Sequence, residues 1–108
     1  EGAEALELTP TAEVQAIRIV QEALNNVRKH SGAWEAWVKV RSRNGWLTIT
    51  VEDTGRGFDP QQVNRTRDQV GLQSMRERAV VAGGQLSIES APGKGTMVTL
   101  TLPVGKGE

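Results

Sequence analysis

The chain has 108 residues, no cysteine and a formal net charge of zero. This length fits one domain with a single modest core, so we expect residues 1–108 to form one unit. The absence of cysteine excludes disulfides, thiolate metal sites and cysteine nucleophiles. Balanced charge gives no overall attraction to nucleic acid or to an anionic membrane, and the sequence has no apolar run long enough to span a bilayer. We therefore expect neither nucleic acid nor a membrane as a partner of this domain.

The first regular element follows a lead-in formed by residues 1–8. Thr9 offers a helix cap, and Pro10 suits the first position of a helix. Apolar residues then recur at steps of three and four, which predicts a helix that ends near residues 30–32. The stripe expected to face the core consists of Ile17, Val20, Leu24 and Val27.

Two hairpins are predicted from alternating apolar and polar residues. The first joins residues 36–41 to residues 46–51 through an Asn44-Gly45 turn. The second joins residues 85–90 to residues 96–102 around a turn rich in glycine and proline.

A polar stretch over residues 58–70 has no strong period and is predicted to be a mobile loop. It leads through Val70-Gly71 into a second amphipathic helix, which Gly83-Gly84 ends. The apolar positions of this helix are Leu72, Met75, Ala79 and Val80. The order of elements indicates an α+β fold, with helices packed on one face of a mostly antiparallel sheet.

Glu22 and Asn26 are candidate metal ligands. They are four residues apart, so a helix places both side chains on one face. A carboxylate and an amide oxygen suit Mg²⁺ bound to a triphosphate. Lys29 and His30, about one turn further on, could meet the phosphate oxygens. The competing interpretation is a solvated helix face, with His30 as a surface histidine at a helix end.

Asp53 follows a strand and precedes Gly55 and Gly57, which permit a close approach of the backbone to a ligand. A carboxylate there can accept a hydrogen bond from the exocyclic amine of adenine, and Thr96 could add a hydroxyl to the same contact. Both features also have ordinary structural explanations, because Asp-Thr-Gly is common turn chemistry and a β-branched residue often begins a strand.

Further candidate phosphate contacts are Gly71, which precedes a helix with free amides, and Arg76 in that helix. Gly93 and Gly95 flank Lys94 in the second hairpin, where glycines are needed for the turn in any case. The sequence contains neither a P-loop nor a GxGxxG fingerprint, so a different nucleotide cradle is needed.

In this order, the boxes around Glu22, Asp53, Gly71 and Gly95 resemble the ATP-binding domain shared by gyrase, the ninety-kilodalton heat-shock chaperone, sensor histidine kinases and MutL. The resemblance covers about residues 10–103. Residues 21–31 and 71–79 look like the histidine kinases that work with NarL-type response regulators.

The resemblance implies a Bergerat-type two-layer sandwich with a mostly antiparallel mixed sheet, in which ATP lies between the helices and a lid formed by residues 58–70. It implies that Asn26 binds Mg²⁺. For Glu22 it leaves two roles open: the matching carboxylate activates water in the ATP-hydrolysing relatives, whereas in the kinases it positions the metal and the attacking group. The predicted nucleotide-binding residues are Lys29, His30, Asp53, Gly55, Gly57, Gly71, Leu72, Arg76, Gly93, Gly95 and Thr96.

The resemblance also implies transfer of the γ-phosphoryl group of ATP to a histidine on a separate helical dimerisation domain, with a response regulator downstream. We do not assign His30, the only histidine of the chain, as that acceptor. The domain is expected to be cytoplasmic, whether or not its parent is anchored in a membrane. Two alternatives remain open: a serine kinase of the anti-sigma-factor type, and an ATP-responsive interaction module without catalytic activity.

Overall fold

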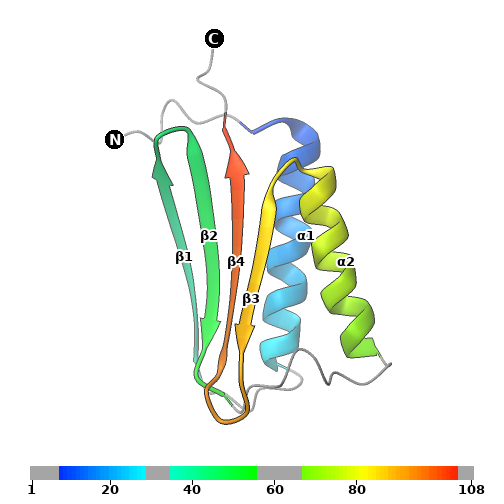
Figure 1. Ribbon diagram of the computed structural model, residues 1–108, viewed down its shortest axis with the longest axis vertical. Coiled ribbons are helices and arrows are strands. Elements are labelled where there is room, and N and C mark those ends of the chain that lie inside the picture. Colours follow the sequence, from blue (N-terminus) through cyan, green and yellow to red (C-terminus); the bar gives the residue numbers. More distant parts are fainter. Residues whose placement is uncertain (1–7, 29–34, 56–66, 105–108) are drawn as a thin grey trace.

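The computed structural model describes residues 8–28, 35–55 and 67–104. These residues form two helices and four strands: α1 (Pro10–Asn26), β1 (Ala36–Arg43), β2 (Trp46–Asp53), α2 (Arg67–Val81), β3 (Gln85–Ser90) and β4 (Thr96–Pro103). Both helices lie on the same face of the sheet (Figure 1). The predicted α+β sandwich is confirmed.

The described strands form one sheet in the order β1-β2-β4-β3, and each of its three pairings is antiparallel. The first hairpin turns at Asn44 and Gly45, whose φ angles of 55° and 83° are those that a tight two-residue turn requires. Both predicted hairpins are therefore confirmed. Because β4 pairs with β2 over its whole length, the turn of the second hairpin lies beside the Asp53 end of β2.

The start of α1 agrees with the prediction from the sequence. The Thr9 side chain accepts a hydrogen bond of 3.0 Å from the Ala12 amide, and Pro10 is the first helical residue. The helix ends at Asn26, with Val27 as its C-cap. The predicted end near residues 30–32 lies outside the described residues.

The core lies between the helix pair and the sheet, but α1 does not present the predicted stripe to it. Ile17 and Leu24 are 54% and 38% exposed, so their assignment to the core is wrong, whereas Val20 packs against the core. The physical reason is close packing, since small alanines let this helix lie near the sheet. The buried positions of α1 are Ala12, Ala16, Ile19 and Ala23.

The second helix begins earlier than its apolar pattern indicates. It starts at Arg67, so Gly71 lies inside the helix and the predicted entrance at Val70-Gly71 is wrong. Residues 67–70 belong to α2 and not to a loop, while residues 58–66 lie outside the described residues. The helix ends before Gly83, which has a φ of 79°, as expected for a glycine stop.

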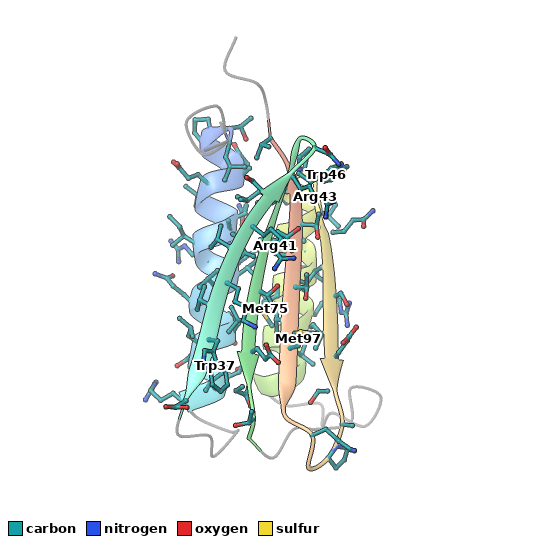
Figure 2. All side chains as sticks on the ribbon, turned by 90° about the vertical axis from the view of Figure 1, so that its left-hand side faces the viewer. Trp37, Arg41, Arg43, Trp46, Met75 and Met97 are labelled. Carbon is teal, nitrogen blue, oxygen red and sulfur yellow. The ribbon has the colours of Figure 1, made fainter. Side chains whose placement is uncertain are left out.

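Met75 and Val80 provide a paired test of the packing of α2. Met75 is fully buried (Figure 2), whereas Val80, also predicted to be in the core, is 75% exposed. Met75→Ala should lower the free energy of unfolding by about 2–5 kcal/mol because it leaves a cavity. Val80→Ala should change it by less than about 0.5 kcal/mol in the same urea titration. Equal losses in the two variants would contradict this packing of α2.

Candidate nucleotide-binding site

Four segments that are distant in the sequence meet at one end of the molecule. The helix α1 and the strand β2 both end there, α2 begins there, and the hairpin between β3 and β4 turns there (Figure 1). This arrangement brings the Asn26 end of α1 and the Asp53 end of β2 to the same edge of the sandwich. The predicted boxes therefore lie in one region.

Asp53 is the one charged side chain that is buried among the described residues, with 5% exposure. Its Oδ1 accepts a hydrogen bond of 2.7 Å from the Gly55 amide, which fixes the orientation of the carboxylate. Within the described part of the chain, no cation forms an ion pair with it. A buried carboxylate that a backbone amide holds in place can accept a further hydrogen bond from a ligand, so Asp53 stays the predicted base contact.

Thr96 lies directly opposite Asp53 in the register of β2 and β4. Its Oγ1 is 2.9 Å from Ser90 Oγ, and Ser90 in turn donates a hydrogen bond of 2.9 Å to the carbonyl of Gly95. The carbonyl can only accept, so the Ser90 proton is committed to it and the Thr96 hydroxyl donates to Ser90. The lone pairs of the Thr96 hydroxyl, which no other described residue engages, can then accept from a ligand beside the Asp53 carboxylate.

Ser90 is a site residue that we did not predict from the sequence. It faces Thr96 across the β3–β4 pairing and holds the orientation of its hydroxyl. The only signal for it in the sequence is its symmetrical position to Thr96 around the hairpin. That signal requires the strand register to be known.

Gly95 cannot carry a side chain in this position. A Cβ here would overlap the carbonyl oxygen of Asp53 and press on Thr54, and the φ of 79° is strained for any L-residue with a side chain. The glycine thus lets the hairpin lie against the end of β2. Gly93 also has a φ of 79° but is exposed in open space, so it serves the turn.

Glu22 lies between the two helices rather than in open solvent. A Cβ on Gly71 would lie 2.5 Å from Glu22 Oε2, so the glycine makes room for this carboxylate on the neighbouring helix. Asn26 lies one turn further along α1, half-buried like Glu22. Glu22 and Asn26 are thus two half-buried oxygen donors one turn apart on α1, and their role as metal ligands stays a prediction.

The remaining predicted residues lie outside the described part of the chain, in the core or on the surface. Lys29, His30 and Gly57 lie outside the described residues. The Leu72 side chain packs in the core, and Arg76 is exposed on α2.

Among the residues that the structure describes, no three of the types His, Cys, Asp and Glu cluster as a metal site. Binding of Mg²⁺ would therefore need phosphate oxygens in addition to Glu22 and Asn26.

A hollow of about 400 Å³ lies beside Asp53, Gly95 and Thr96. Three other residues that line it, Glu52, Met97 and Glu89, are neighbours in register and alternate with the inward-facing positions. The hollow therefore opens mainly on the outer face of the sheet. The nucleotide face implied by the resemblance is the opposite one, toward the helices, so we do not equate this hollow with the adenine pocket.

The fold and these four converging segments define a nucleotide-binding α+β sandwich. Residues 11–106 match the family of histidine kinase-, DNA gyrase B-, and HSP90-like ATPases. The chain therefore belongs to this ATPase family, and its similarities place it with the histidine kinase ATP-binding domains.

Curated relatives with similar sequences are bacterial kinases. The sensor histidine kinase LiaS of Bacillus subtilis (strain 168) is 42% identical over 87 residues, which are 81% of this chain and 24% of LiaS. The signal transduction histidine-protein kinase/phosphatase DegS of Brevibacillus brevis is 37% identical over 92 residues, which are 85% of this chain and 23% of DegS. The chain thus spans about a quarter of the length of these relatives.

Solved structures with the same fold include the ATP-binding domain of PrrB from Mycobacterium tuberculosis. It has a TM-score of 0.68 and 27% identity, covering 84% of this chain and 68% of that chain. Full-length ShkA in complex with AMPPNP has a TM-score of 0.72 at 19% identity, covering 85% of this chain and 22% of ShkA. At that identity, the ShkA similarity supports the fold alone.

Replacing the buried carboxylate tests the base contact. Asp53→Asn should weaken Mg-ATP binding by about 1–3 kcal/mol, because a charge-assisted hydrogen bond to the adenine amine is lost. Glu52→Gln is the matched control, since Glu52 is on the other face and forms only an exposed ion pair of 3.5 Å with Lys39. Calorimetric titration measures both affinities, and equal values for the two variants would remove Asp53 from the base contact.

Proposed function

We propose that this chain is the catalytic ATP-binding domain of a two-component sensor histidine kinase. Its substrate is Mg-ATP, and its reaction is transfer of the γ-phosphoryl group to a histidine on a separate helical dimerisation domain. A response regulator would then receive the phosphoryl group. The observation that carries this proposal is the buried carboxylate of Asp53, which lies where the three other segments of the resemblance also converge.

Asp53 and Thr96 supply the recognition of the base. Adenine presents an amine to a carboxylate at this position, whereas guanine presents a carbonyl at the same ring position. The guanine carbonyl and the Asp53 carboxylate would be two acceptors facing one another, which is unfavourable in a site shielded from water. Asp53 and Thr96 therefore select adenine. The hydrogen bond from Gly55 to Asp53 holds the acceptor in place before the ligand arrives.

Glu22 and Asn26 supply oxygen donors at the phosphate end. They fit Mg²⁺, which prefers a few oxygen ligands from the protein together with substrate phosphates. When bound, the ion would neutralise charge that develops on the transferring phosphoryl group. Gly71 keeps the Glu22 carboxylate against α2, where it can orient the attacking group of the acceptor.

The acceptor histidine is assigned to another domain, with His30 left outside the reaction. None of the helices in the described part of the chain is long and apolar enough to cross a membrane. We place the domain in the cytoplasm because its substrate, ATP, is held there. No observation on the described residues favours the serine kinase or the non-catalytic module.

Asn26→Ala tests the role of the metal-binding face. The transfer rate to a separately purified acceptor domain should fall at least about 100-fold, which corresponds to about 3 kcal/mol of lost transition-state stabilisation. Circular dichroism should show an unchanged fold, since Asn26 is outside the core. Gln85→Ala, at the far end of β3, is the control and should keep the rate of the unmodified chain.

The label from γ-labelled ATP should be recovered on the acceptor domain in an acid-labile, base-stable form. If the Asn26→Ala variant folds and keeps the transfer rate of the unmodified chain, Asn26 is only a solvated helix residue. Efficient labelling of His30 in the isolated chain would contradict the assignment of the acceptor to another domain.

A further inference from the structure

A groove of about 580 Å³ runs between α1 and α2, beside the proposed phosphate end. None of the side chains that line it belongs to the hydrophobic core, so it opens on the surface of the helix pair that is turned away from the sheet. We call it the arginine groove. It is lined by Arg18, Gln21, Glu22, Leu24, Asn25, Arg28, Ser74 and Arg78.

The described residues that line the arginine groove carry an excess of positive charge, in a chain whose net charge is zero. Three guanidinium groups line it against one carboxylate, that of Glu22. Arg28 donates a hydrogen bond of 2.8 Å to Asn25 Oδ1, and Arg78 donates one of 2.9 Å to Gln15 Oε1. Both arginines therefore bond to neutral amides. Arg18 has no hydrogen bond or ion pair with any other described residue.

Most of the donor capacity of these arginines is therefore unused within the described structure. Each guanidinium has about five N–H donors, and the bonds above engage only one on Arg28 and one on Arg78. Such groups favour bidentate pairing with carboxylates or phosphates. The charge of the groove thus selects an anionic partner.

The spacing of the arginines distinguishes between two kinds of anion. Arg18 lies on α1 and Arg28 lies two residues beyond its end, where the backbone is still helical, so their ten-residue separation corresponds to about 15 Å along the helix axis. A single phosphate group cannot contact both ends of that span. A partner helix that carries carboxylates about three turns apart matches it.

We propose that the arginine groove docks an acidic face of the helical acceptor domain. This inference rests on the proposed function, because the acceptor is the partner whose histidine must approach the γ-phosphate. Glu22 connects the two regions, since it lines the groove and also contacts Gly71 at the phosphate end. A helix in the groove therefore lies next to the carboxylate that orients the attacking group.

Charge reversal at two exposed arginines, Arg18 on α1 and Arg28 just beyond its end, tests the docking surface. The variant Arg18→Glu with Arg28→Glu should raise the KM for the acceptor domain at least about tenfold while kcat at saturating acceptor is retained. The matched control is Arg41→Glu with Arg43→Glu, which makes the same change of net charge at exposed positions of β1 (Figure 2). The control should keep the KM of the unmodified chain within about twofold.

Two further measurements sharpen the result. The calorimetric affinity for Mg-ATP should be the same in the unmodified chain and in both variants. Acidic-to-lysine substitutions on the acceptor helix should restore the low KM of the Arg18→Glu, Arg28→Glu variant, which a merely structural role of the arginines would not produce.

Three outcomes would overturn the inference. The first is an equal KM in the groove and control variants, and the second is a loss of kcat without a change in KM. The third is weakened Mg-ATP binding in the groove variant alone, which would assign the arginines to the nucleotide. The absence of any transfer by the unmodified chain is a different result, since it would remove the proposed function and this inference with it.

Discussion

The antiparallel pairing of β2 with β4 is the constraint on which the site depends. It places Asp53 directly opposite Thr96 and brings the hairpin backbone at Gly95 against the end of β2. A shift of one residue in this register would turn Asp53 to the outer face and bury its neighbour instead. The base contact therefore follows from sheet pairing, and Ser90 adds the hydroxyl orientation that pairing alone leaves open.

The helix layer completes the site through small residues. Alanines on the buried face of α1 let it pack closely on the sheet, and Gly71 lets the Glu22 carboxylate lie against α2. The helices meet at both ends: Arg78 in the last turn of α2 donates to Gln15 near the start of α1, and at the phosphate end Glu22 lies beside Gly71. The outward surface of the same helix pair carries the arginine groove, so one packing arrangement positions both the metal donors and the proposed docking face.

The sequence predicts local features of this fold better than its helix orientations. Turn chemistry at Asn44 and capping at Thr9 depend on neighbouring residues only, and both predictions are confirmed. The buried face of α1 was predicted wrongly because Ile17 and Leu24 are large apolar residues that recur at helical spacing. The positions that are in fact buried are mostly alanines. Likewise, the start of α2 at Arg67 could not be read from a polar segment, and the role of Ser90 required the strand register.

The convergence of segments that are distant in the sequence on one nucleotide site can be tested in solution. Amide chemical-shift mapping of the isotope-labelled chain during titration with Mg-ATP tests it most directly. The amides of Asn26, Asp53, Gly71 and Thr96 should shift together, with one common dissociation constant, while the outer residues of β1 should not respond. Shifts confined to one of these segments, or centred on β1, would contradict it.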